Sequence, residues 1–385
     1  MRIKDFAVEQ WMNTWETRCR FNVAETCCDS LSIDDLFELG GASASEFLGE
    51  LAGRRLTYGH IEGSPEFLSG VCSLYRTVGP EHVVPTHGAA GANMLVLSTL
   101  CGPGDHVVAV MPTYQQLYSI PEMCGAEVSA LHLDPADRYH VDVDRLMALC
   151  RPDTSVICIN NPNNPTGALL STEELESIVE VARSVGAWLV CDEVYRPLNA
   201  AGEYQESVAD LYGRAVCTSS MSKAWSLAGI RLGWVVCKDD DLRRRLLSHR
   251  DYDLISCSML DEAVGAFALA HKDALIERSR RIVRDNRAVL MDWVAGEEHL
   301  SVVEPEGGTT ALVYYDYPMD SYEFCTRLVQ EEGALVTPGD CFEEPRSMRI
   351  GYAYSADPSG LREGLEAVSR FCRTVEGELQ AGVRA

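Results

Sequence analysis

The chain lacks the features that mark membrane, secreted and repeat proteins. No apolar run approaches the roughly 18 residues that a membrane-spanning helix needs. The first residues, MRIKDFAVEQWMNTWE, mix charges with aromatics and contain no apolar signal core. There are no repeats, low-complexity tracts or Pro/Ser-rich linkers. We therefore expect a cytoplasmic protein without a membrane partner, whose domain boundaries lie inside compact structure.

Positive charge is also scarce. The sequence has 33 Lys and Arg against 58 Asp and Glu, which gives a formal net charge of −25. Such a surface disfavours nucleic acid and anionic membranes as partners. An anionic ligand would need a local positive pocket, so arginines inside motifs are candidates for binding it.

Cysteine is abundant, but its spacing does not indicate metal. None of the 15 cysteines forms a CxxC pair or a Cys/His cluster with zinc spacing. Several lie in apolar, strand-like runs, such as Cys158 in SVICIN and Cys191 in WLVCDE. We therefore expect buried, reduced thiols and no metal site.

The length and hydrophobic pattern predict an α/β fold with a second, smaller part. A chain of 385 residues fits a large domain plus a smaller one. From about residue 80, Val- and Ile-rich runs alternate with helical stretches, which predicts a mostly parallel sheet sandwiched by helices. The expected strands are His82–Thr86, His106–Val110, Glu127–Leu131, Val156–Ile159, Trp188–Cys191, Ala215–Thr218 and Leu232–Val236. The expected helices include Gly91–Leu100, Gln115–Cys124, Val141–Cys150, Thr172–Val185 and Asp239–Asp251.

The remainder of the chain predicts one long helix and a small α+β domain. The helical stretch covers roughly Leu260 to Trp293 and could connect the two parts. Beyond it the expected strands are Ser301–Glu304, Thr310–Tyr315, Ala334–Thr337 and Met348–Tyr352, and the expected helices are Ser321–Glu332 and Pro358–Gly377.

One segment sets a lysine among small hydroxyl side chains. Residues 219–234 read SSMSKAWSLAGIRLGW, with Lys223 near the centre and Arg231 eight positions later (231 − 223). A lysine that forms a Schiff base with an aldehyde cofactor must lose a proton and lie close to an anionic phosphate. Ser220, Ser222 and Arg231 could supply that phosphate with hydrogen bonds and positive charge.

Two further motifs follow neighbouring strands. Asn160–Gly167 reads NNPNNPTG, a rigid turn that could orient an Asn side chain or be a structural loop only. Asp192–Tyr195 reads DEVY and ends the next strand. A buried acid is costly unless it is paired, and a protonated pyridine nitrogen would be such a partner. A helix cap is the alternative role for Asp192.

The order of these motifs resembles the fold-type-I pyridoxal-phosphate enzymes, in particular the class I and II aminotransferases. The resemblance covers about Leu56 to Arg349. It implies pyridoxal 5′-phosphate as cofactor and an aspartate-aminotransferase-like fold. It also implies that Lys223 carries the Schiff base and moves protons, that Asp192 pairs with the pyridine nitrogen, and that Asn164 and Tyr195 bind the phenolic oxygen.

The resemblance assigns the remaining site residues in the same way. Phosphate would be bound by Ser220, Ser222, Arg231 and the backbone of a cup formed by Gly88, Ala89 and Ala90. Tyr114 matches the aromatic that stacks on the pyridine ring, and Arg349 matches the arginine that grips the substrate carboxylate beside Asn164. Tyr58 matches a residue that reaches the phosphate of a neighbouring subunit, which implies a homodimer with shared sites.

The domain boundaries expected from this resemblance divide the chain into three. Residues 1–50 would join the small domain and the dimer interface, residues 51–285 would bind the cofactor, and residues 286–385 would form the small C-terminal domain. Two departures from the family pattern concern the substrate. Glu25 could meet a cationic ligand or form an ordinary salt bridge. Gly307 and Gly308 lie where many members place a bulkier residue, which would leave room for a larger substrate.

Three hypotheses follow. The first is an aminotransferase acting on an α-amino acid. The second keeps every residue role but changes the outcome to elimination, replacement or cyclisation. This second hypothesis fits a branch that resembles capreomycidine synthase and other enzymes of specialised metabolism, and it includes S-adenosylmethionine or a cationic amino acid as substrate. The third is a non-catalytic cofactor-binding regulator, which ranks last because such regulators carry an added DNA-binding domain and this chain is strongly acidic.

Overall fold

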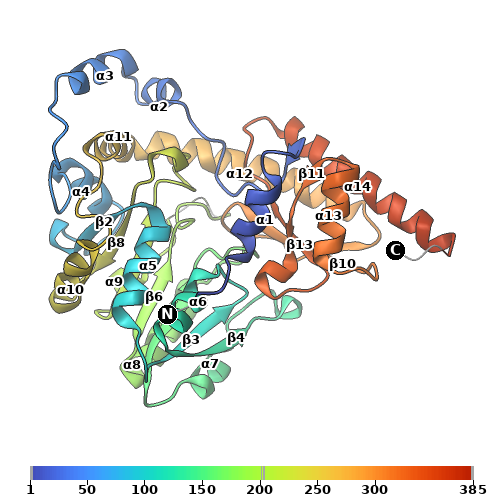
Figure 1. The fold of residues 1–385 in the computed structure, drawn as a ribbon, viewed down its shortest axis with the longest axis horizontal. Helices are drawn as coiled ribbons and strands as arrows, with labels where there is room; N and C mark the ends of the chain where they lie inside the picture. The colour runs from blue at the N-terminus through green and yellow to red at the C-terminus, as the bar shows by residue number, and fades with distance from the viewer. Residues whose placement is uncertain (1–2, 201, 203, 383–385) are drawn as a thin grey trace.

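A seven-stranded sheet forms the centre of the larger part of the molecule (Figure 1). The computed structural model describes residues 3–200, 202 and 204–382. The strand order is β2-β8-β7-β6-β5-β3-β4. The strands are β2 (Val83–Thr86), β3 (His106–Met111), β4 (Glu127–His132), β5 (Thr154–Asn160), β6 (Trp188–Asp192), β7 (Ala215–Ser220) and β8 (Gly233–Cys237). Only β8 runs antiparallel to its neighbours. The predicted, mostly parallel sheet is therefore confirmed.

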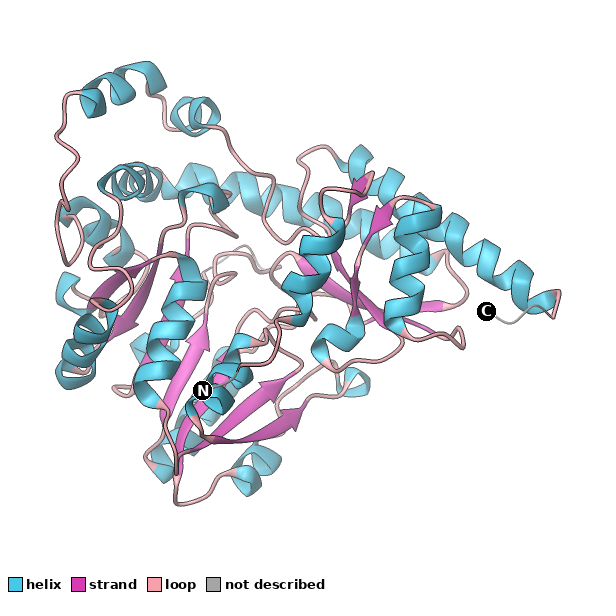
Figure 2. Ribbon diagram, in the orientation of Figure 1, coloured by secondary structure: helices cyan, strands magenta, loops and turns pink. Residues whose placement is uncertain are grey.

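Helices cover both faces of this sheet (Figure 2). Side chains alternate between the two faces along each strand, so Val107 and Ala109 enter one apolar cluster while Val108 and Val110 enter another. The first cluster is completed by α5 (Gly88–Leu100), α6 (Gln116–Cys124) and α10 (Asp240–Arg250). The second is completed by α4 (Pro65–Cys72), α8 (Thr172–Val185) and α11 (Met259–Ala270). The short helices α7 (Val143–Leu149) and α9 (Val208–Leu211) lie on the second side.

The last third of the chain forms a separate α+β unit, as the sequence predicts. An antiparallel sheet has the order β12-β13-β10-β9, and a second, two-stranded sheet pairs β1 with β11 in parallel. The strands are β1 (Phe21–Asn22), β9 (Leu300–Val302), β10 (Thr310–Tyr315), β11 (Ala334–Leu335), β12 (Thr337–Pro338) and β13 (Ser347–Gly351). Helices α13 (Ser321–Glu331) and α14 (Pro358–Gln380) pack against these strands (Figure 1).

The long helix predicted between the two parts is broken. It consists of α11 and α12 (Lys272–Ala295), which meet at His271. The imidazole Nδ1 of His271 lies 2.9 Å from the carbonyl oxygen of Phe267, and the two rings are 4.2 Å apart. No Gly or Pro marks this break, so the sequence pattern did not show it. The predicted boundary at residues 285 and 286 lies inside α12.

The N-terminal segment forms three helices that the sequence analysis did not predict. These are α1 (Ala7–Trp15), α2 (Ile33–Leu39) and α3 (Ala44–Ala52). Helix α1 lies against the C-terminal unit, where the indole of Trp11 donates a 2.8 Å hydrogen bond to the carbonyl of Val336. Helices α2 and α3 extend away from the body of the molecule (Figure 1). Within the described residues, no helix combines the length and the apolar character needed to cross a bilayer.

Candidate active site

The carboxyl ends of β5, β6 and β7 meet at one cavity. Asn160 and Asp192, the last residues of β5 and β6, are paired in register, and Ser220 ends β7. The cavity has a volume of about 460 Å³ and is partly open to solvent. It is lined by twelve of the predicted site residues, namely Glu25, Ala89, Ala90, Tyr114, Asn164, Asp192, Tyr195, Ser220, Ser222, Lys223, Arg231 and Arg349. Segments far apart in sequence therefore converge on one place, where α/β sheets commonly bind ligands.

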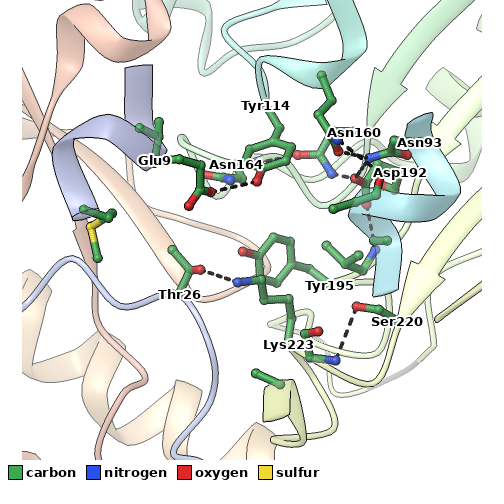
Figure 3. A pocket seen from close by; sticks show the side chains of 18 of the residues that line it. Glu9, Thr26, Asn93, Tyr114, Asn160, Asn164, Asp192, Tyr195, Ser220 and Lys223 are labelled. Atoms are coloured by element: carbon green, nitrogen blue, oxygen red, sulfur yellow. Dashed lines mark hydrogen bonds between the residues drawn. The ribbon is translucent and has the colours of Figure 1, made fainter. Parts of the chain in front are cut away.

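Asp192 is buried at one wall of this cavity and is held by hydrogen bonds (Figure 3). Its carboxylate accepts from Asn93 Nδ2 at 2.9 Å and from the Val194 amide at 3.2 Å. Asn93 is fixed in turn by Thr218, which donates to its Oδ1 at 2.6 Å, and by Gln116. Burial raises the pKa of Asp192, while the bonds from Asn93 and Val194 oppose that rise. The sequence analysis missed Asn93, which lies on α5.

The amine of Lys223 faces the same space. Its Nζ donates a 2.6 Å hydrogen bond to the hydroxyl of Thr26 (Figure 3). The same atom lies 3.7 Å from the Cys27 sulfur. Burial favours the neutral amine, but the acidic groups of Cys27, Tyr195 and Glu25 outweigh it and raise the pKa of Lys223. Burial also raises the pKa of the Cys27 thiol to about 11. Thr26 and Cys27 were not among the predicted site residues.

An anion cradle lies at the start of α5. Gly88 has a positive φ of 66°, and a Cβ there would lie 2.9 Å from a guanidinium nitrogen of Arg231. The backbone of Gly88 is also approached closely by Gly233, where a Cβ would lie 2.5 Å from the Gly88 carbonyl carbon. Arg231 donates to the hydroxyl of Ser222 at 3.4 Å. A helix N-terminus, hydroxyl groups and a guanidinium together suit a phosphate.

Arg349 is a buried cation without a carboxylate partner among the described residues. It lies on β13, is 3% exposed, and donates to Asn164 Oδ1 at 3.2 Å, to the Ala24 carbonyl at 3.1 Å and to the Thr337 hydroxyl at 3.1 Å. Its Nε has no hydrogen-bond partner. Burial lowers the pKa of Arg349. A buried guanidinium is costly unless an anion meets it, and a carboxylate matches its geometry.

The N-terminal segment forms the outer wall of the cavity. Tyr114 donates a 3.0 Å hydrogen bond to Glu9 of α1, and its ring lies 4.9 Å from that of Phe6 (Figure 3). Glu16 also lines the cavity. Glu25 accepts two backbone hydrogen bonds of 2.8 Å, from Thr26 and Cys27, and none of the described residues forms a salt bridge with it. Burial opposes the charged form of Glu25, but Lys223 and these bonds lower its pKa.

Two features that the sequence analysis singled out lie outside this cavity. Tyr58 is 63% exposed and lies outside it, with its carbonyl accepting a hydrogen bond from Ser256. The expectation that Gly307 and Gly308 leave room for a larger substrate is wrong, because neither residue lines the cavity. A Cβ on Gly307 would lie 2.8 Å from the ring of Pro162, and one on Gly308 would lie 3.4 Å from the ring of Tyr195. These glycines allow close packing behind Tyr195.

Metal-binding groups are not assembled in the part of the chain that the structure describes. No three His, Cys, Asp or Glu side chains there are grouped to hold a metal ion. All fifteen cysteines are free, and most of them are buried, as expected from their apolar surroundings.

Comparison with known proteins assigns the chain to a family. A sequence profile for aminotransferase class I and II matches residues 44–368. The chain belongs to the class I and II aminotransferase family. Among similar proteins, capreomycidine synthase of Streptomyces vinaceus is 34% identical over 294 residues, which are 76% of this chain and 75% of that protein.

Solved structures of related aminotransferase-family proteins agree with this assignment. A PLP-dependent aminotransferase from Streptococcus suis superposes with a TM-score of 0.93 at 40% identity, covering 97% of this chain and 99% of that one. The PLP-dependent cyclase OrfR superposes with a TM-score of 0.89 at 27% identity, covering 97% and 98%. Both the predicted family and the predicted aspartate-aminotransferase-like fold are confirmed.

The chain is therefore a transferase that uses pyridoxal 5′-phosphate. The residues at the cavity fit this cofactor. Gly88 has a positive φ that suits glycine, and the Arg231 guanidinium lies close to it at the start of α5. The buried carboxylate of Asp192 would suit a protonated ring nitrogen, and Lys223 lines the same cavity.

Proposed function

We propose that this enzyme removes the amino group of an α-amino acid, with Lys223 as the proton-transferring amine and Arg349 as the carboxylate-binding residue. The observation that carries the proposal is that both side chains line one cavity together with Asp192. Arg349 has an unpartnered donor and no carboxylate partner among the described residues, so the α-carboxylate of a substrate can pair with it.

Each remaining residue has a proposed part in holding the cofactor. The bound cofactor supplies an electron-withdrawing ring that stabilises negative charge on the neighbouring carbon. Asp192 would keep the ring nitrogen protonated, and Tyr195 and Asn164 would donate hydrogen bonds to the phenolic oxygen. Tyr114 would stack on the ring. The phosphate would be bound by the amides of Gly88, Ala89 and Ala90, by the hydroxyls of Ser220 and Ser222, and by Arg231.

Lys223 would then act on the substrate directly. Its Nζ would accept the proton from the substrate Cα and would give a proton to C4′ of the cofactor. This transfer needs an amine that is fixed within reach of both carbons, because positioning and proton transfer supply most of the rate. The cofactor would supply the acceptor for the amino group, and the substrate would leave as a keto acid.

The charge of the cavity supports a cationic substrate. Glu9, Glu16 and Glu25 line it, and burial together with repulsion from Glu25 and Glu9 raises the pKa of Glu16. Glu16 is therefore close enough to Glu9 and to Glu25 to be repelled by both. An amino acid with an ammonium or guanidinium side chain would relieve this repulsion while Arg349 binds its carboxylate.

Elimination, replacement or cyclisation is the second candidate function. It is favoured by the 34% identity with capreomycidine synthase and by the structural match to the PLP-dependent cyclase OrfR. The same residues would bind the cofactor and remove the Cα proton. The outcome differs in whether C4′ receives a proton or a group leaves the substrate side chain.

A homodimer with shared sites is also proposed. Tyr58 is exposed and lies outside the cavity of its own chain, which is the arrangement expected if it serves a neighbouring site. Leu56 and Ile61 are exposed apolar residues close to Tyr58 in the sequence. Tyr252 and Ile255 are also exposed, and they lie close in the sequence to Ser256, which bonds to the Tyr58 carbonyl. Burial of these side chains between two copies would be favourable.

The decisive test follows the visible absorption of the cofactor-loaded protein while single amino acids are added. Conversion of the bound cofactor to its amine form with one amino acid would establish transamination. We expect arginine or lysine to cause this conversion more readily than norleucine. Release of a leaving group without that conversion would establish the second function. Lys223→Ala should lose the band of the covalently attached cofactor. An unchanged band in this variant would contradict the assignment of Lys223.

A further inference from the structure

Thr26 brings a hydroxyl group against the amine of Lys223. The Nζ to Oγ1 distance is 2.6 Å, shorter than that to any other group bonded to this amine (Figure 3). Thr26 is 8% exposed, so its hydroxyl lies away from bulk water. It also lies beside the buried side chain of Tyr195. An ammonium or amine bonded to a buried oxygen is held more firmly than one that is solvated.

Thr26 is itself fixed by one distant residue and by its neighbour in the sequence. The hydroxyl of Thr309 donates a 2.6 Å hydrogen bond to the Thr26 carbonyl, and Thr309 is fully buried. On the other side, the Thr26 amide donates to the Glu25 carboxylate at 2.8 Å. Thr26 is therefore anchored at both backbone groups, and its side chain is left to meet Lys223.

We propose that Thr26 is a positioning residue for Lys223 during proton transfer, an inference that rests on the proposed function. The free amine of Lys223 has one lone pair and two N–H bonds. When the Thr26 oxygen accepts one N–H, the rotation of the amine is restricted and the lone pair is aimed away from Thr26 into the cavity. This lone pair would accept the Cα proton, and the ammonium so formed would hold that proton in the cavity until it is returned. Thr26 gains and loses no proton in this sequence.

The alternative role for Thr26 is to fill space beside the lysine. Valine has nearly the same shape as threonine but cannot accept a hydrogen bond, whereas serine keeps the hydroxyl and loses the methyl group. The pair Thr26→Val and Thr26→Ser therefore separates the two roles. A space-filling residue would tolerate valine better than serine, and a positioning residue would tolerate serine better than valine.

The test compares cofactor-loaded wild-type and variant enzymes on the preferred amino acid and on its α-deuterated form. In Thr26→Val we expect kcat to fall about 10- to 100-fold with KM within about threefold, because proton transfer and not binding is impaired. The deuterium isotope effect on kcat should rise, since the transfer becomes more rate-limiting. Thr26→Ser should restore kcat to within about threefold of wild type.

Wild-type kcat and an unchanged isotope effect in Thr26→Val would overturn the inference. If that variant does not fold or bind cofactor, Thr309→Val provides the second measurement. It removes the bond that holds the Thr26 carbonyl, and it should raise the isotope effect while the cofactor band is retained; an unchanged effect would equally overturn the inference. Failure of wild-type enzyme to exchange the α-deuterium of any amino acid would instead contradict the proposed function.

Discussion

Asp192 shows how hydrogen bonds oppose the effect of burial on the pKa of an acid. Its carboxyl group is 4% exposed, and burial raises its pKa. The side-chain amide of Asn93 donates to the charged form and so lowers that pKa. Only the charged form can hold a protonated ring nitrogen. Asn93 is therefore placed to extend the activity of the enzyme toward lower pH.

Replacing Asn93 tests this directly. Asn93→Ala removes the bond that stabilises the carboxylate, so the pKa of Asp192 should rise, and the acid limb of the kcat/KM profile should move to higher pH. The free energy of unfolding should fall by about 1–3 kcal/mol, because buried polar partners are left unpaired. Thr218→Val is the matched control, since it removes only the bond that orients Asn93, and its shift should be smaller. A profile that does not move in Asn93→Ala would contradict this role.

A site residue could be predicted when it lies in a recognisable sequence motif, and not when its partner is distant in the sequence. Lys223, Asp192 and Asn164 lie in compact motifs that follow strands, and the cavity contains all three. Thr26 and Asn93 act through partners 197 and 99 positions away. Nothing adjacent to them in sequence shows which residue they will meet, so only the folded chain identifies them.

At the scale of elements, helix α1 supplies the acidic part of the cavity. Glu9 lies in the first turn of α1, and Glu16 is the C-terminal cap residue of this helix. The two are seven positions apart (16 − 9), which places both on one face of the helix. Helix α1 is fixed to the C-terminal unit by the bond from Trp11 to Val336, and the hydroxyl of Tyr114 bonds to Glu9. This face of α1 is therefore held toward the cavity.

Neutralising these carboxylates should change substrate preference. In Glu16→Gln and Glu9→Gln we expect the KM for arginine or lysine to rise about 2- to 5-fold, because exposed charge pairs contribute modestly. The KM for norleucine should stay the same or fall. Glu46→Gln on α3, which lies outside the cavity, is the control and should leave both values unchanged. Equal effects on arginine and norleucine would contradict a cation-binding role.

The elements of the central sheet were predictable because their pattern is strong. Each of its seven strands is a short Val- or Ile-rich run between helices, and each appears close to its expected position. Helices α1, α2 and α3 lack such a pattern, because they pack through a few side chains against distant parts of the chain. The break at His271 depends on a contact between its ring and Phe267, which propensity does not reveal.

At the scale of the whole molecule, the shared-site dimer can be tested by mixing two defects. Lys223→Ala removes the amine of a site, while Tyr58→Ala should weaken cofactor binding in the neighbouring site. In co-expressed hybrids, one site of each mixed dimer has both residues, so about a quarter of all sites should be intact. Activity at limiting cofactor should therefore exceed the mean of the two parents. Sedimentation as a monomer, or activity equal to that mean, would contradict shared sites.

The cavity is formed by segments that are distant in the sequence, and this has a practical consequence for handling the protein. Thr26 meets Lys223 across 197 positions and Thr309 across 283, so the cofactor site exists only when both ends of the chain are in place. A ligand that binds only the native state also stabilises it, by an amount that grows with its concentration. The colour of the bound cofactor should therefore serve as a gauge of complete folding, and a colourless preparation that regains its colour on cofactor addition can be judged native without an activity assay.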